Sequence, residues 1–368
     1  MAISQSSLRV TFFVTIIALA LTGLVFIYSA SSVYAMELYQ DSAFFVKKQL
    51  VALILAAIIT CILALLPLET LQKVAPIFFL ISLGLTCATL IPGIGSVING
   101  SRRWLFLAGF SLQPSELLKS SFILYFASYL DRKPINSARP SKTFLPILII
   151  LGICCIILLK QPDFGQAVTL TLSVLLIFFI TGGNSKYLLW LSFIFIIGTG
   201  ILGIAKPYRF RRILIFLDPW KDPQGAGFQI IQSLIAIGSG SWLGTGIAQS
   251  KQKFFYLPMQ HTDFIFSVIA EETGFIGVSL LISLFLLLLW SGIRLAKHMT
   301  TTFGAIACLG FTFLVLLQTV MNICVSTGLV PTKGIGLPFI SYGGSSLLGL
   351  SILLGSVLNA SLEESFSH

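Results

Sequence analysis

The segment FIFSVIAEETGFIGVSLLISLFLLLLW, residues 264–290, decides the fold class of this chain. Its only charged side chains are those of Glu271 and Glu272, near its amino-terminal end. A helix needs roughly twenty apolar residues to cross a hydrocarbon core about 30 Å thick, and this run is longer than that. The segment therefore predicts a transmembrane helix.

Comparable apolar runs recur through all 368 residues, of which 56% are hydrophobic and 10% charged, with a mean hydropathy of +0.97. Soluble domains carry roughly 25% charged residues, so a soluble fold is excluded. We predict the other spans at residues 10–28, 50–66, 74–91, 117–130, 144–159, 167–181, 188–204, 305–327 and 341–358. The sequence thus favours an all-α polytopic membrane protein of about ten transmembrane helices, a single domain over residues 1–368 with both termini on one side.

The first run could instead be a signal peptide, since Val33-Tyr34-Ala35 loosely resembles a cleavage site, but its length favours a retained helix. The cysteines lie inside apolar runs, where we expect reduced packing residues rather than disulfides. They are Cys61, Cys87, Cys154, Cys155, Cys308 and Cys324. No Cys/His spacing resembles that of a zinc site, so the sequence predicts no structural metal.

Two polar stretches, residues 91–114 and 206–263, are too long to be simple turns, and the second has room for a functional site. The positive-inside rule weakly favours cytoplasmic termini, which would make residues 206–263 extracytoplasmic. The net charge of +10, with many cations near that outer face, suggests an anionic ligand there. Anchoring to lipid headgroups is the alternative for about half of these cations.

Residues 257–266, LPMQHTDFIF, place Asp263 at the mouth of the first helix considered, next to His261 and Thr262. An aspartate at the centre of a transmembrane helix costs about 3 kcal/mol, so such groups usually face a polar cavity or a partner. The alternative is a shallower acid that stabilises the helix dipole.

Residues 111–119, SLQPSELLK, are typical of a helix start, because Pro114 is tolerated in a first turn. Glu116 and Lys119 are three residues apart and share one helix face, so we interpret them as a structural ion pair. The preceding motif NGSRRW, residues 99–104, contributes the cation Arg103.

Residues 207–212, PYRFRR, alternate cations with aromatic side chains, as an interfacial segment does. Arginine can grip phosphate oxygens in a bidentate fork, which makes Arg209, Arg211 and Arg212 candidates for a bound phosphate. Nothing resembles a Walker loop or a dinucleotide fingerprint, which argues against nucleotide-driven chemistry.

Residues 328–346 are dense in glycine and proline and cannot continue a helix. Irregular backbone at membrane depth is tolerated only beside protein or a water-filled cavity, so we expect a re-entrant or loop segment here. Its only charged side chain is that of Lys333.

Together with Lys160-Gln161-Pro162-Asp163-Phe164-Gly165, these four motifs resemble those of the SEDS family of cell-wall polymerases, named for shape, elongation, division and sporulation. The resemblance covers nearly the whole chain. Within the family, the string Pro331-Thr332-Lys333-Gly334 is similar to that of the division-type members. One departure is the presence of Phe255 and Met259 where division-type relatives often carry acids, which puts any regulatory role of such acids in doubt.

The resemblance implies a ten-helix fold in the bacterial cytoplasmic membrane, with cytoplasmic termini and a large extracytoplasmic loop before the eighth helix. The implied enzyme polymerises lipid II into glycan strands at the division septum. Its implied partners are a class B penicillin-binding transpeptidase and other division proteins, with no nucleic acid. Motif by motif, Asp263 matches the family's catalytic acid, Arg103 its arginine before tryptophan, and Asp163 its Gln-Pro-Asp aspartate.

We therefore expect Asp263 to act as a base on an acceptor hydroxyl while cations stabilise the departing diphosphate. The candidate substrate-binding residues are Arg103, Arg209, Arg211, Arg212, Lys333, His261, Thr262, Gln161 and Asp163. A divalent cation such as Mg²⁺ or Mn²⁺ could share the neutralisation of the diphosphate. Two alternatives stay open from the sequence: a lipid II flippase, and a noncatalytic scaffold for the transpeptidase.

Overall fold

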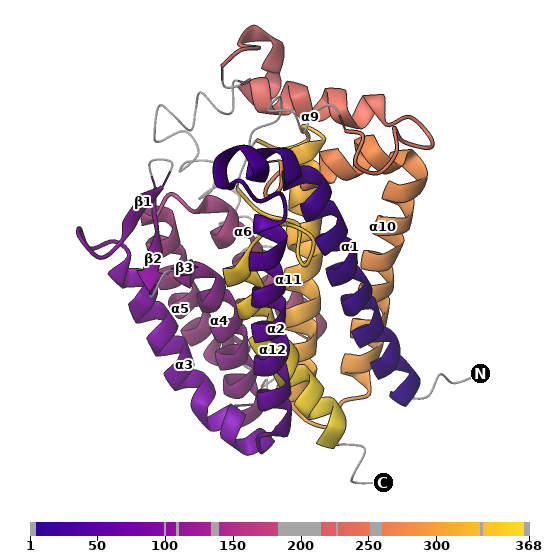
Figure 1. The fold of residues 1–368 in the computed structure, drawn as a ribbon. Coiled ribbons are helices and arrows are strands. Elements are labelled where there is room, and N and C mark those ends of the chain that lie inside the picture. The colour runs from indigo at the N-terminus through magenta and orange to yellow at the C-terminus, as the bar shows by residue number, and fades with distance from the viewer. Residues whose placement is uncertain are drawn as a thin grey trace.

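The computed structural model describes residues 5–98, 101–107, 110–133, 140–182, 215–225, 227–250, 260–331 and 334–363 (Figure 1). Its helices are α1 (Gln5–Tyr39), α2 (Phe44–Leu65), α3 (Leu68–Ala88), α4 (Pro114–Arg132), α5 (Pro140–Lys160), α6 (Phe164–Ile180), α9 (Phe228–Ser239), α10 (Ile265–Lys297), α11 (Thr302–Ser326) and α12 (Gly344–Glu363). Three short strands, β1 (Ser96–Ile98), β2 (Ser101–Leu107) and β3 (Phe110–Leu112), and the 3₁₀ turn η1 (Pro219–Lys221) complete these elements.

The prediction of an all-α polytopic membrane protein is confirmed. Among the described residues, α1, α2, α3, α10, α11 and α12 are long and apolar enough to cross a membrane. The spans predicted at the positions of α4, α5 and α6 are helical too, whereas the predicted span 188–204 lies outside the described residues. The start of α1 and the end of α12 both lie at the end of the bundle opposite α9 (Figure 1).

Two predicted loops contain regular structure. The stretch 91–114 forms an antiparallel sheet of order β1-β2-β3, in which Val97 pairs with Arg102 and Phe106 with Ser111. The stretch 206–263 contains α9, which buries Ile230, Ile231 and Ala236 on one face. A helix of 12 residues is too short to cross a membrane, so hydropathy along the sequence does not distinguish it from the surrounding loop.

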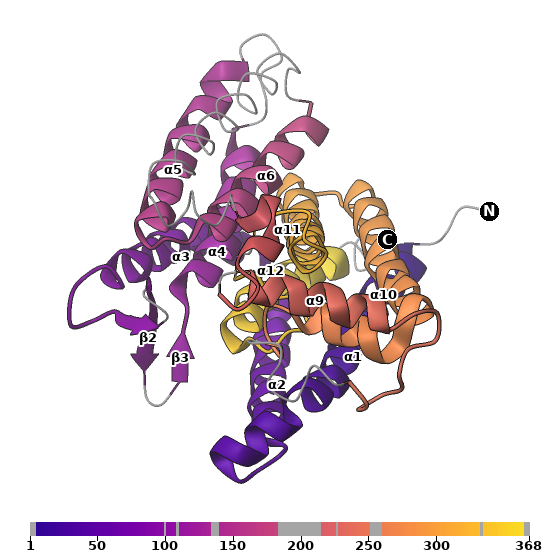
Figure 2. The same cartoon turned by 90° about the horizontal axis from the view of Figure 1, so that it is seen from above.

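Helices α4, α11 and α12 lie at the centre of the bundle, and α1, α2, α3, α5, α6 and α10 surround them (Figure 2). Phe122 and Phe126 of α4, with Phe303 and Phe311 of α11, are fully buried. Because α4 faces protein on all sides, it can carry serines and a charged pair that a lipid-facing helix would not tolerate.

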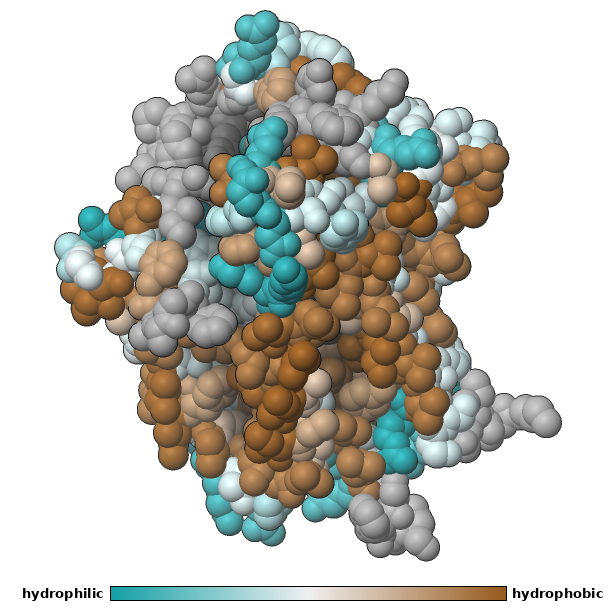
Figure 3. All heavy atoms as spheres, in the orientation of Figure 1, coloured by the Kyte–Doolittle hydropathy of each residue, from teal (hydrophilic) through white to brown (hydrophobic). Residues whose placement is uncertain are grey.

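Apolar side chains cover the waist of the molecule, and hydrophilic ones gather above and below (Figure 3). Many of these apolar side chains are exposed on the outer helices, including Leu21 of α1, Ile58 of α2 and Leu80 of α3. Water would make such a surface unstable, whereas lipid tails solvate it.

Helix α10 is interrupted at Gly274, where φ is +64°. The segment that follows α9 fills the break, since Phe275 donates its backbone N–H to the carbonyl of Ser241 (2.9 Å) and Gly246 donates to that of Glu272 (3.0 Å). A Cβ at Gly274 would lie 2.4 Å from the nitrogen of Gly244, so only glycine fits. The short amino-terminal part of α10, which follows Asp263, is thereby set apart from the membrane span.

Candidate active site

Asp263 precedes α10, and two other segments hold its backbone. The side-chain amide of Asn322 in α11 donates hydrogen bonds to the carbonyl oxygens of Asp263 and Ile335, both at 2.8 Å. The hydroxyl of Ser341 donates to the carbonyl of Thr262 at 2.5 Å and accepts the N–H of Leu337 at 2.7 Å. The glycine-rich stretch before α12 therefore lies directly against the Asp263 segment.

The Asp263 residue is partly exposed, and the pKa of its carboxyl is raised. Burial raises its pKa to about 6, the guanidinium of Arg103 opposes that rise, and the carboxylate of Asp163 adds to it. At neutral pH the side chain is therefore mostly a carboxylate with a pKa close to that of an effective general base. A Cβ at Gly334 would lie 3.3 Å from Oδ2 of Asp263, so a side chain there would crowd the carboxylate.

Arg103 of β2 contacts the turn between α5 and α6. Its Nε donates to the carbonyl of Gln161 at 3.0 Å, and Nη2 donates to that of Pro162 at 2.5 Å. Its Nη1 lies 3.6 Å from Oδ1 of Asp163. These contacts use at most three of the five N–H donors of a guanidinium, and the side chain is 21% exposed, which leaves capacity for an anionic ligand.

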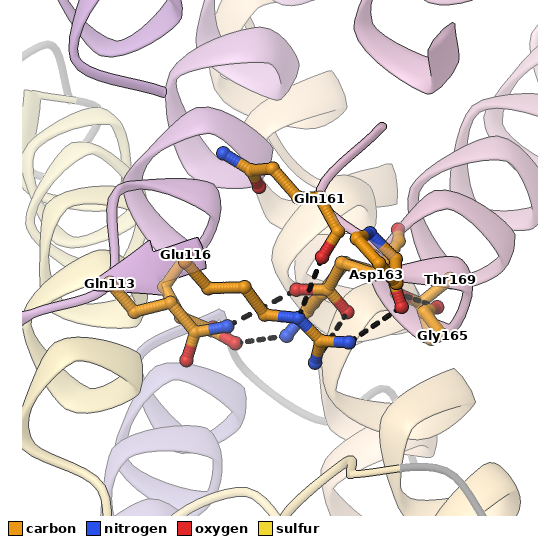
Figure 4. Close-up of polar contacts among 9 residues, drawn as sticks. Gln113, Glu116, Gln161, Asp163, Gly165 and Thr169 are labelled. Carbon is orange, nitrogen blue, oxygen red and sulfur yellow. Dashed lines mark hydrogen bonds and ion pairs between the residues drawn. The ribbon is translucent and has the colours of Figure 1, made fainter. Parts of the chain in front are cut away.

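Asp163 is the buried partner in this arrangement, and Gln113 points toward it (Figure 4). The amide of Gln113 donates to Oδ2 of Asp163 at 3.2 Å. Burial raises the pKa of Asp163, although Arg103 opposes the rise. The side-chain amide of Gln161 donates hydrogen bonds to the carbonyl of Thr86 and the hydroxyl of Thr89, at the end of α3. The side chain thus anchors the turn, while the main-chain carbonyl of Gln161 accepts the bond from Arg103.

Below this network, Glu116 and Lys119 form an ion pair of 3.0 Å, and both are buried. The amide of Gln166 also donates to the Glu116 carboxylate. Pro114 is the first residue of α4, as its position in the sequence suggests. Both charges belong to α4, and the bond from Gln166 joins them to α6.

His261 lies on the other side of Asp263 in a cluster of rings. Burial lowers the pKa of its imidazole to about 4, so the ring is neutral at physiological pH. Its backbone carbonyl accepts the N–H of Tyr342 at 2.9 Å, and its ring centroid lies 4.5 Å from that of Phe45. His261 is therefore not a cation for a phosphate group.

The structure thus places Arg103, Asp163 and Asp263 close enough for their charges to interact, and the main-chain carbonyl of Gln161 accepts a hydrogen bond from Arg103. The predicted residues Arg209, Arg211, Arg212 and Lys333 lie outside the described residues. In the part of the chain that is described, no three His, Cys, Asp or Glu side chains are grouped to hold a metal ion. All six cysteines are free thiols.

Sequence reasoning missed Asn322, Ser341 and Gln113. Asn322 interrupts the apolar run 305–327 with an amide, which is costly in a membrane unless it is hydrogen-bonded, and this signal could have marked it. Ser341 and Gln113 stand in polar surroundings, where nothing sets them apart.

Comparison with known proteins decides the family. The profile of the family described as "Cell cycle protein", which comprises FtsW, RodA and SpoVE proteins, matches residues 9–366. This chain belongs to the SEDS family. This SEDS protein is 42% identical over 359 residues to the probable peptidoglycan glycosyltransferase FtsW of Trichlorobacter lovleyi. The alignment covers 94% of this chain and 91% of that one.

One further relative and two solved structures are similar to this SEDS protein. It is 40% identical over 339 residues to stage V sporulation protein E of Bacillus subtilis, covering 92% of this chain and 93% of that one. A solved chain described as "Structural coordination of polymerization and crosslinking by a peptidoglycan synthase complex" superposes with a TM-score of 0.77 at 33% identity, covering 96% of this chain and 97% of that one. The crystal structure of RodA from Thermus thermophilus gives 0.67 at 29% identity, with 96% of both chains covered.

Proposed function

We propose that this SEDS protein is a peptidoglycan glycosyltransferase that polymerises lipid II into glycan strands for septal wall synthesis. The observation that carries the proposal is Asp263, a carboxylate with a pKa of about 6 beside Arg103 at the mouth of a span. Two relatives named probable peptidoglycan glycosyltransferase FtsW are each 42% identical over more than nine tenths of this chain, which supports the same activity.

In this reaction Asp263 accepts the proton of the 4-hydroxyl of an acceptor sugar. The hydroxyl oxygen bonds to the anomeric carbon of the donor while the carbon–oxygen bond to the diphosphate breaks, with inversion, and undecaprenyl diphosphate departs. Asp263 then returns its proton to solvent. A positioned base contributes typically 10²–10⁴ in rate.

Among the described residues, Arg103 would stabilise the departing diphosphate, because its guanidinium is close enough to Asp263 for the two charges to interact. Arg209, Arg211, Arg212 and Lys333 are proposed for the same task from the sequence. A divalent cation held by the diphosphate is a further proposal, which chelation with EDTA during polymerisation would test.

The same proposal includes a class B penicillin-binding transpeptidase as partner, together with other division proteins. The likeness to a chain of a peptidoglycan synthase complex supports such a partner. It also includes cytoplasmic termini and an extracytoplasmic residue Lys221, whose side chain is 79% exposed. A Lys221→Cys variant should react with a membrane-impermeant maleimide in intact cells, and reaction only after lysis would contradict this topology.

The decisive test uses Asp263→Asn, which keeps the size of the side chain and removes the base. Purified with its transpeptidase partner and given lipid II in detergent, the wild type should form glycan polymer and the variant none. Glu69→Gln, a change at an exposed carboxylate, is the matched control and should polymerise normally. A detergent micelle does not separate two compartments, so a protein that is only a flippase would give no polymer even as wild type. Polymer from Asp263→Asn would exclude Asp263 as the base.

A further inference from the structure

The turn that joins α1 to α2 is flanked by two stacked aromatic rings, of which one is exposed and the other half-buried. Tyr39 and Phe44 lie with ring centroids 3.8 Å apart and planes 7° from parallel. Tyr39 is 48% exposed. The ammonium group of Lys48 lies 4.5 Å from the centroid of Phe44, so a cation flanks the pair.

Behind this pair, rings continue without a break to the residue two positions before Asp263. The ring centroid of Phe45 lies 5.3 Å from that of Phe44 and 4.5 Å from that of His261. Tyr34 and Tyr342 lie 5.7 and 5.9 Å from the same imidazole. The exposed surface at Tyr39 is therefore connected to the candidate active site by direct ring contacts.

The surroundings of the pair place it at the boundary between membrane and water. Met36 and Leu38 are exposed apolar side chains, whereas Asp41 and Lys47 form an ion pair of 2.7 Å at the tip of the turn. Hydrophilic side chains lie over this end of α2, just above the apolar belt (Figure 3). A sugar attached to a membrane lipid through a diphosphate occupies the same level.

Among the described residues, several buried side-chain polar atoms have no hydrogen-bond partner, and one of them lies in this cluster of rings. Nδ1 of His261 is buried and makes no hydrogen bond in the part of the chain that is described. The pKa of His261, about 4, keeps the ring neutral, so a hydroxyl or amide suits this nitrogen better than an anion does. A ligand can bond this buried nitrogen only if the surrounding rings move, whereas the C–H face of a sugar can pack directly on the exposed ring of Tyr39.

We propose that the Tyr39–Phe44 pair forms a carbohydrate subsite, which holds the glycan strand beyond the sugar that reacts at Asp263, and that the buried rings behind it support the pair. This inference rests on the proposed polymerase function and deepens it. A strand held there stays at high effective concentration next to Asp263 after each addition, so the next addition competes favourably with release. The subsite would set the length of the product.

The test compares Tyr39→Ala with Tyr39→Trp and with Tyr28→Ala, a control at a tyrosine of α1 that is 46% exposed. The measurement is the length distribution of glycan strands made from lipid II by the complex with its transpeptidase partner. We expect Tyr39→Ala to shorten the mean strand roughly 2- to 10-fold, the effect of losing one aromatic contact. Tyr39→Trp should restore the length and Tyr28→Ala should leave it unchanged.

Equal lengths in wild type and Tyr39→Ala would overturn the subsite while leaving the polymerase intact. Equal shortening by Tyr28→Ala would overturn it as well, because both tyrosines would then be membrane anchors. If the wild type makes no polymer, the proposed function fails by itself. The subsite is then judged by saturation-transfer NMR with soluble N-acetylglucosamine oligomers, whose signals must weaken in Tyr39→Ala for the proposal to stand.

Discussion

The side chain of Asn322 donates a hydrogen bond of 2.8 Å to the main-chain carbonyl of Asp263, and this amide is fully buried. It bonds the carbonyl of Ile335 at the same distance. A single amide in α11 thus ties together the segment that precedes α10 and the segment that precedes α12.

We expect Asn322→Leu to lower both stability and activity, because it removes the donor from two main-chain carbonyls, one buried and one partly buried. Each unsatisfied buried group costs about 1–3 kcal/mol. Thr319→Val is the control, since the Thr319 hydroxyl bonds the carbonyl of Val315 within its own helix. Thermal unfolding in detergent and polymerisation rate measure the two effects, and normal activity in Asn322→Leu would mean that this amide does not position Asp263.

The polymerisation rate should depend on the ionisation of Asp263. Because the base must be deprotonated, and its pKa is about 6, the rate should fall as the pH drops through about 6. Arg103 lowers that pKa, so Arg103→Ala should move the midpoint of the profile to higher pH, and Asp163→Asn should move it lower. A profile of kcat/KM between pH 5 and 8 checks both directions. A midpoint that stays fixed in both variants would assign the titration to another group.

The buried pair of Glu116 and Lys119 should behave as a unit. Replacing one partner leaves a buried charge unmatched, and we expect Glu116→Gln or Lys119→Met to cost about 3–5 kcal/mol of stability. The double variant should be destabilised less than the sum of the two single variants, which a double-mutant cycle of unfolding free energies measures. Additive losses would show that the two charges do not interact in the folded protein.

Gly274→Ala should disturb the site without abolishing the membrane span. A Cβ there would meet the backbone of Trp242 and Gly244, and φ is positive. Gly84→Ala in α3 is the control, because nothing lies within 4 Å of its added Cβ. We expect a lower thermal midpoint and a loss of polymerisation in Gly274→Ala only, and unchanged activity would mean that the break in α10 does not position Asp263.

Hydropathy predicts the helices of this fold because the membrane requires long apolar runs, and α2, α10 and α11 follow that rule. The same reasoning hides the break at Gly274, since the sequence stays apolar on both sides of it. It also hides α9, whose single apolar face is shorter than a span. Tertiary contacts with protein, rather than lipid, decide these features.

Asp263 and Asp163 stand out in the sequence as carboxylates beside apolar helices, and the family motifs add Arg103. Their convergence could not be read from the chain, because each comes from a different element. The ring series from Tyr39 to His261 depends on the packing of three separate segments. No spacing along the chain signals it.

The pairing of α2 with α12 joins two parts of the chain that are made far apart in time. Gln49 bonds Ser341 and Asn359 bonds the end of α2, with sequence separations of 292 to 296 residues. At a synthesis rate of roughly 5–20 residues per second, α2 waits about 15–60 s for its partner. During that interval its polar groups must be hydrogen-bonded by lipid headgroups, water or the insertion machinery, and the contacts between α2 and α12 form only after α12 has entered the membrane.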